Sequence, residues 1–101
     1  MVSRPISDKA EVSIDFPEKF YHGSFGHQSR YEVTADDEGV HIYLVRGGPE
    51  RRHVGFHVHY QLLADLLDGA ADAAAKVEDI QPYQREKIRA AAAKFAEAMS
   101  R

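Results

Sequence analysis

Residues 31–60, YEVTADDEGVHIYLVRGGPERRHVGFHVHY, contain three runs in which apolar and polar side chains alternate. The runs cover residues 31–35, 40–45 and 53–60, and short segments rich in Asp, Gly and Pro separate them. A period of two residues is typical of a strand with one buried face. Strands of this kind joined by short turns predict an antiparallel β-meander.

Burial also fixes how these strands pair, because residues directly opposite each other share one face of the sheet. A four-residue loop at 36–39, ending in a left-handed Gly39, and a three-residue loop at 48–50 bring the apolar sets together. The predicted apolar pairs are Val33 with Ile42, Ile42 with Phe56 and Leu44 with Val54. On the polar face, the same register sets His41 opposite His57.

The second part of the chain has a helical composition, since 12 of the 14 alanines lie from Ala64 onward. Apolar residues recur at spacings of three and four between Leu62 and Val77, and again between Ile88 and Met99. Strands come first and helices second, without alternation. The predicted fold class is therefore α+β, an antiparallel sheet of three to four strands followed by two C-terminal helices packed on one of its faces.

A chain of 101 residues has the length of one domain. We expect residues 1–11 to form a flexible N-terminal arm and residues 12–101 to form a single α+β domain. The alternation from Val12 to Phe16 predicts an additional short strand. Residues 18–29 contain two glycines and no regular period, so we expect a loop or an irregular strand there.

The composition excludes several classes of protein. The chain has no cysteine, which excludes a disulfide framework, a thiolate metal site and a cysteine nucleophile. Its net charge of -3 argues against a surface built to bind nucleic acid. Its apolar runs are shorter than the roughly 18 to 20 residues of a membrane span, and its first ten residues lack the apolar core of a signal peptide. We therefore expect a soluble cytoplasmic domain without a membrane or nucleic-acid partner.

All six histidines precede residue 60, and several of them fall on the polar face of the predicted meander. We call this surface the histidine face; its predicted side chains are Arg30, Glu32, Thr34, His41, Tyr43, His53, His57 and His59. One face of an antiparallel sheet is often solvated, which accounts for polar residues in general. Solvation alone does not account for the choice of histidine at neighbouring positions.

Two functions are consistent with the histidine face. The first is a small non-catalytic binding or assembly module that forms a homodimer through this face, because aromatic rings on an exposed sheet gain from a partner. The residues expected at this interface or ligand site are Glu32, His41, Tyr43, His57 and His59. In this interpretation we expect no catalytic residue and no cofactor.

The alternative is a metal or small-ligand site in which His41, His57 and His59 bind Zn, Ni or Cu. Opposed and alternate residues on a sheet bring imidazoles within reach of one ion, and imidazole is a common ligand of these metals. Glu32 or a water could complete the coordination shell. The same histidines could instead make a dimer sensitive to pH, since imidazole changes charge near neutrality.

A second group of residues lies beside a predicted hairpin tip. The run Arg51-Arg52-His53 is basic and could contact a phosphate or a carboxylate. Charges at an exposed turn are more often simply solvated, which is the competing interpretation of this run.

Overall fold

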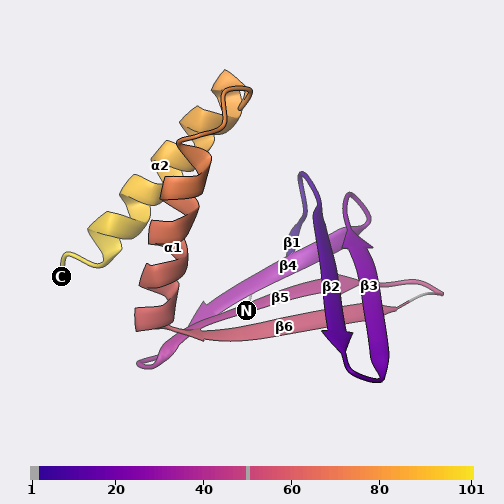
Figure 1. The fold of residues 1–101 in the computed structure, drawn as a ribbon. Coiled ribbons are helices and arrows are strands. Elements are labelled where there is room, and N and C mark those ends of the chain that lie inside the picture. The colour runs from indigo at the N-terminus through magenta and orange to yellow at the C-terminus, as the bar shows by residue number, and fades with distance from the viewer. Residues whose placement is uncertain (1–2, 50) are drawn as a thin grey trace. The chain divides into compact units, whose positions relative to one another are not determined.

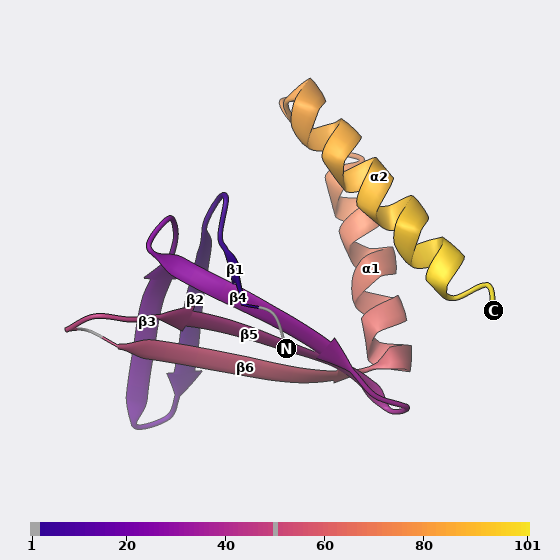
Figure 2. The same ribbon diagram turned by 180° about the vertical axis from the view of Figure 1, so that it is seen from behind.

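The computed structural model describes residues 3–49 and 51–101. Its elements, in chain order, are β1 (Arg4–Pro5), β2 (Ala10–Phe16), β3 (Lys19–Phe25), β4 (Ser29–Ala35), β5 (Gly39–Arg46), β6 (Arg52–His59), α1 (Tyr60–Ala74) and α2 (Pro82–Ala98). Figures 1 and 2 show them from opposite sides. Antiparallel strands followed by two C-terminal helices confirm the predicted α+β class.

The main sheet has the strand order β1-β4-β5-β6, and every neighbouring pair is antiparallel. The predicted register is confirmed along its whole apolar face, where Val33 pairs with Ile42, Ile42 with Phe56 and Leu44 with Val54. His41 lies opposite His57, as predicted. A slip of one residue would move the apolar side chains to the histidine face, so burial selects this pairing.

The predicted left-handed conformation of Gly39 is wrong. Among the described residues, only Gly48 has a positive φ, of 93°. Gly39 is buried, and a Cβ atom there would overlap the carbonyl oxygen of Val58 and lie 2.8 Å from the Cα atom of His59. The close approach of the β6 backbone therefore requires glycine at this position.

Of the two alternatives for residues 18–29, a loop or an irregular strand, the structure shows a strand over most of the segment, because residues 19–25 form β3. This strand pairs with β2 in a separate antiparallel sheet, in which Val12 lies opposite Gly23 and Ile14 opposite Tyr21. Aromatic residues occupy both faces of β3 and Gly23 interrupts one of them, which hides the period of two.

The β2–β3 hairpin carries a buried aromatic residue at its C-terminal end. Phe25, at the end of β3, is 3% exposed and is the only buried apolar residue among those described. The hairpin lies beside the end of β6 that begins at Arg52 (Figures 1 and 2). Arg52 donates a hydrogen bond from Nη1 to the carbonyl oxygen of Ser24, 3.5 Å away.

The chain divides into two compact units, one ending at Leu66 and the other beginning at Leu67. In the second unit, α2 begins with Pro82, at a position where the missing backbone N–H costs no hydrogen bond. Arg85 donates to the carbonyl oxygens of Ile80 (3.1 Å) and Val77 (3.3 Å) and so holds the segment that precedes α2.

Neither helix in the described part of the chain is long and apolar enough to cross a membrane. The packing of the helices on the sheet stays a prediction. So do the bounds of a flexible arm at 1–11 and of a single domain at 12–101.

Candidate functional site

The histidine face carries a continuous row of rings contributed by β5 and β6. Along this row, the ring centroids are 4.7 Å apart for His59 and His57, 3.8 Å for His57 and His41, 6.4 Å for His41 and Tyr43, and 5.5 Å for Tyr43 and His53. The register creates the closest contact, because His41 and His57 are directly opposed and their rings are parallel to within 8°.

Gly55 allows the middle of this row to form. It lies opposite Tyr43, and a Cβ atom on residue 55 would be 2.9 Å from the tyrosine ring. Without a side chain at 55, the Tyr43 ring can lie over the β6 backbone and reach His53. Glycine at position 55 of β6 is therefore explained by the packing of the Tyr43 ring.

An acidic turn closes the row at the end where β4 is joined to β5. Asp36 begins this turn, and its Oδ1 atom accepts hydrogen bonds from the backbone N–H groups of Glu38 (2.8 Å) and Gly39 (2.9 Å). This is the local arrangement that Asp favours in turns, since its short side chain can satisfy backbone donors two and three residues further on. The carboxylate is thereby fixed in orientation.

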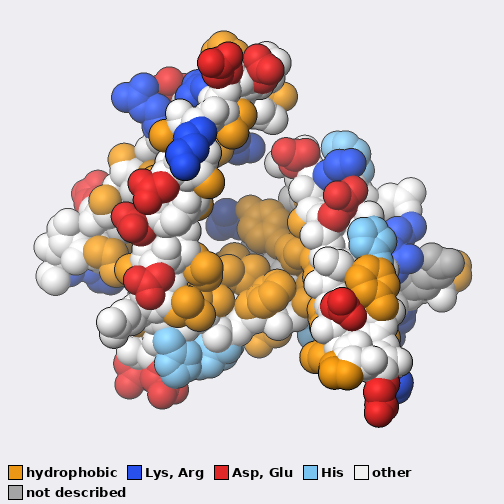
Figure 3. Space-filling view, in the orientation of Figure 1, with side chains coloured by type: hydrophobic (Ala, Val, Ile, Leu, Met, Phe, Trp, Pro, Cys, Tyr) orange, Lys and Arg blue, Asp and Glu red, His pale blue; other side chains and the backbone are white. Residues whose placement is uncertain are grey.

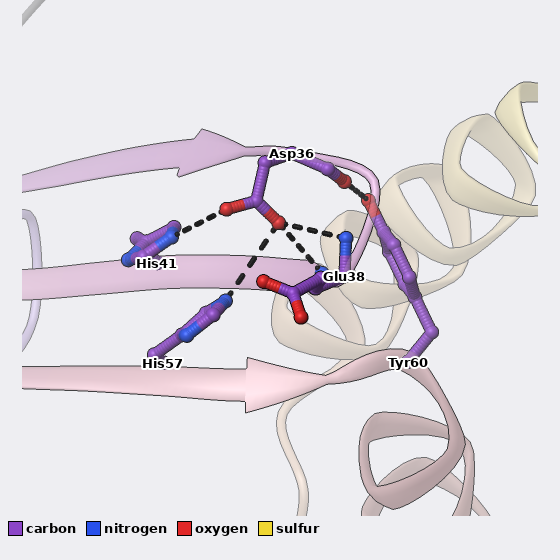
Figure 4. Close-up of polar contacts among 6 residues, drawn as sticks. Asp36, Glu38, His41, His57 and Tyr60 are labelled. Carbon is purple, nitrogen blue, oxygen red and sulfur yellow. Dashed lines mark hydrogen bonds and ion pairs between the residues drawn. The ribbon is translucent and has the colours of Figure 1, made fainter.

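Two histidines approach the fixed carboxylate (Figure 4). Nε2 of His41 lies 3.0 Å from Oδ2 of Asp36, at hydrogen-bond distance. Nε2 of His57 lies 3.7 Å from Oδ1. Asp36, His41 and His57, which we call the Asp36 cluster, have donor atoms that all lie within 4.8 Å of one another.

The first residue of α1 also holds the turn. The hydroxyl of Tyr60 donates to the carbonyl oxygen of Asp36 (2.8 Å), and the backbone N–H of Tyr60 donates to the carbonyl oxygen of Glu38 (3.2 Å). These bonds connect the end of β6 to the turn between β4 and β5. They fix the position of Asp36 relative to the strand that carries His57 (Figure 4).

The environment of Asp36 favours its charged form. The hydrogen bond with His41, followed by those from the backbone of Glu38 and Gly39, holds the pKa of the Asp36 carboxyl well below its usual range. Asp37 and Glu38 follow directly in the sequence. The turn therefore offers a concentration of acidic side chains beside two imidazoles, which attracts cations.

The spacing of the donor atoms is close to that of a metal shell. Ligands about 2.0 to 2.1 Å from a tetrahedral ion are separated by about 3.3 Å. The distance from Nε2 of His41 to Oδ2 of Asp36 is 3.0 Å, and the distance from Nε2 of His57 to the other oxygen, Oδ1, is 3.7 Å, so the two values lie on either side of this separation. The two imidazole rings are stacked, with centroids 3.8 Å apart and planes within 8° of parallel, so the rings must turn out of this stack before both Nε2 lone pairs can point to the same ion. Their side chains are 28% and 32% exposed, which leaves room on the solvent side for this rotation.

Two other residues expected on this face, His59 and Glu32, lie beside members of the row of rings. The His59 ring lies next to the His57 ring in the same row, and the planes of the two rings make an angle of 53°. Glu32 lies opposite Tyr43 and lines a hollow of about 310 Å³ together with His41, Tyr43 and His53. Among the described residues, the donor groups close enough to share one ion are the Asp36 cluster and the acidic run 36–38.

Asp36 was not among the residues singled out from the sequence. Its position was visible as the first residue of the loop 36–39, but its role depends on the turn. Only when Oδ1 caps the backbone of residues 38 and 39 does the carboxylate face His41. An Asp that opens a tight turn next to a strand bearing a histidine is the signal that could have identified it.

Comparison of the chain with protein-family models, with curated proteins and with solved structures finds no match.

Proposed function

We propose that this protein is a small non-catalytic binding module whose histidine face holds a divalent transition-metal ion at Asp36, His41 and His57. The observation that carries the proposal is the convergence of one carboxylate and two Nε2 atoms within 4.8 Å. Two imidazoles and a carboxylate suit Zn, Ni or Cu, and three protein ligands leave a position for water or a small ligand.

Two further features support this proposal. The carboxylate is already oriented by backbone donors before any ion binds, which lowers the cost of ordering it. The low pKa of Asp36 keeps this ligand deprotonated at neutral pH. The hydrogen bond from Nε2 of His41 to Asp36 must be broken when the metal binds, so binding costs this bond and releases the Nε2 proton.

Calorimetric titration with zinc sulfate and with nickel chloride tests the proposal. We expect binding of one ion per chain, and a loss of affinity of at least about 100-fold in Asp36→Asn, His41→Gln and His57→Gln, since even groups that only support a ligand are worth about 10 to 100-fold. Asn at 36 can still accept the backbone hydrogen bonds of the turn. His22→Gln, at an exposed position in β3, is the matched control and should bind like the wild type.

His59→Gln separates the Asp36 cluster from a set formed by His41, His57 and His59. The His59 ring contacts His57 but is not part of the convergent group, so its replacement should change the affinity by less than about tenfold. If His59→Gln abolished metal binding while Asp36→Asn bound the metal with wild-type affinity, the ligands would be the three histidines and not the Asp36 cluster. If neither metal shifts the NMR signals of His41 and His57 at stoichiometric amounts, the chain has no metal site of this kind.

A homodimer through the histidine face is a second candidate function. The continuous row from His53 through Tyr43 to His59 favours it, because flat aromatic rings supply contact area at low entropic cost. The apolar residues left exposed elsewhere in the chain are consistent with association. Sedimentation of the wild type tests this candidate independently of metal.

A cytoplasmic location is part of the same proposal. The absence of cysteine from the sequence is consistent with it. Fractionation of cells that express the protein would test the location.

A further inference from the structure

A second hollow lies away from the Asp36 cluster, where the β2–β3 hairpin meets the start of β6. Its volume is about 390 Å³, within the range of roughly 300 to 1,000 Å³ that is typical of small-ligand sites. The strand rise of about 3.3 Å per residue separates Arg52 from His57 by about 16 Å along β6. The hollow is therefore distinct from the Asp36 cluster.

One wall of the hollow is apolar. Ile14 and Tyr21 are directly opposed in the β2–β3 sheet, and Phe25, the buried residue at the end of β3, lies on the same side of that sheet. Ile14 and Tyr21 are themselves 38% and 52% exposed, so they present apolar surface that a ligand can cover. Figure 3 shows hydrophobic, basic, acidic and histidine side chains together on the face of this hairpin that is turned to the viewer.

The opposite wall is basic. It is formed by Arg51, Arg52 and His53, which are consecutive at the start of β6. The Arg52 side chain passes close to Gly23, since a Cβ atom on residue 23 would be at contact distance, 3.4 Å, from Cδ of Arg52. The Arg52 side chain therefore lies along the hairpin and bonds to the carbonyl oxygen of Ser24, which connects the two walls.

The charge of the hollow selects the kind of ligand. None of the described residues that line it is acidic, and Arg51, which lines it, is exposed. Arginine binds carboxylate and phosphate oxygens with two parallel N–H donors. An apolar wall facing a basic wall thus fits a molecule with an apolar body and one anionic group.

We propose that this hollow binds a small organic anion, whose aromatic or aliphatic body contacts Ile14, Tyr21 and Phe25 and whose carboxylate or phosphate group contacts Arg51. Arg52 positions the basic wall against the hairpin. This assignment is independent of metal binding at the Asp36 cluster, since no residue is shared between the two sites.

Titration of isotope-labelled protein with 1-naphthoate, followed by NMR, tests the assignment. We expect the amide signals of residues 12–14, 21–25 and 51–54 to shift and those of α2 to stay in place. 1-Naphthyl phosphate should bind in the same hollow, and the ratio of the two affinities distinguishes a carboxylate site from a phosphate site. The neutral 1-naphthylmethanol should bind at least about tenfold more weakly, because it lacks the group that Arg51 recognises.

Two variants probe the two walls. Arg51→Gln should weaken naphthoate binding about 10 to 100-fold, as expected for the loss of charge-assisted hydrogen bonds. Ile14→Ala should weaken it roughly fivefold by removing apolar contact. Arg89→Gln, an exposed arginine in α2, is the matched control and should bind like the wild type.

Three results would overturn the proposal. The first is the absence of shifts in the hollow with both anions at millimolar concentration. The second is equal affinity for naphthoate and naphthylmethanol, which would show an apolar hollow without anion recognition. The third is an equal response of Arg51→Gln and Arg89→Gln. An unchanged pattern of amide signals outside the hollow shows that each variant is folded.

Discussion

At the scale of single residues, Asp36 connects the fold to the candidate site. Its Oδ1 atom completes the turn between β4 and β5, while its Oδ2 atom faces His41. The same carboxylate thus holds a hairpin together and offers a ligand. Its negative charge strengthens both sets of contacts, which gives the stability of the protein a definite dependence on pH.

We expect Asp36 to stabilise the fold at neutral pH and to stop doing so in acid. Its pKa is lowered in the folded protein, first by the hydrogen bond with His41 and then by those from Glu38 and Gly39. A lowered folded-state pKa contributes stability that is fully present above the ordinary carboxyl value of about 3.9 and is lost as the pH falls through the folded-state value. The free energy of unfolding, measured with urea from pH 7 down to pH 2, should therefore fall more steeply in the wild type than in Asp36→Asn.

Asp37→Asn provides the control for this pH series. Asp37 is the next residue of the same turn and takes part in none of the bonds that hold Asp36. Its replacement should leave the slope of stability against pH close to that of the wild type. Parallel pH profiles for the wild type and Asp36→Asn would mean that the carboxylate contributes nothing through its charge.

At the scale of the elements, the close approach of β5 and β6 depends on Gly39. A methyl group at this position would overlap the carbonyl oxygen of Val58, which belongs to the backbone and cannot rotate away. We expect Gly39→Ala to lower the free energy of unfolding by about 1 to 3 kcal/mol, the usual cost of inserting a group into a filled space. Gly47→Ala is the control, since a Cβ atom there has no neighbour within 4 Å. Equal stability of the two variants, measured by urea unfolding, would contradict this account.

The elements also show what can be predicted from the sequence and what cannot. The register of β4, β5 and β6 is predictable because Val33, Ile42 and Phe56 must share a face. The strand β3 is not, because aromatic residues on both of its faces remove the period on which the prediction depends. The role of Asp36 escapes a pattern-based argument for a different reason, since it arises from the geometry of one turn and from a hydrogen bond to His41.

At the scale of the whole molecule, the described part of the chain leaves much apolar surface in contact with solvent. Phe25 is its only buried apolar residue, whereas Leu66 is 53% and Ile88 is 62% exposed. Burial of apolar surface supplies the dominant stabilisation of a fold, at roughly 25 cal/mol per Å². A second copy of the chain would add burial, and we propose the row of rings on the histidine face as the surface where such a contact forms.

If the protein dimerises through the histidine face, its thermal stability must depend on its concentration. Association that favours the folded state raises the midpoint of unfolding as the concentration increases. We expect this rise in the wild type, together with a dimer mass in sedimentation experiments. Tyr43→Glu should abolish both, because it places a charge in the middle of the row of rings, next to His41 and His53.

Gln28→Glu adds the same charge at an exposed position between β3 and β4, outside the histidine face, and should behave like the wild type. A monomeric wild type whose midpoint does not change with concentration would rule out the dimer. A dimer that survives Tyr43→Glu would instead place the contact on another surface. In both cases the metal titration stays informative, because all three ligands of the Asp36 cluster come from one chain.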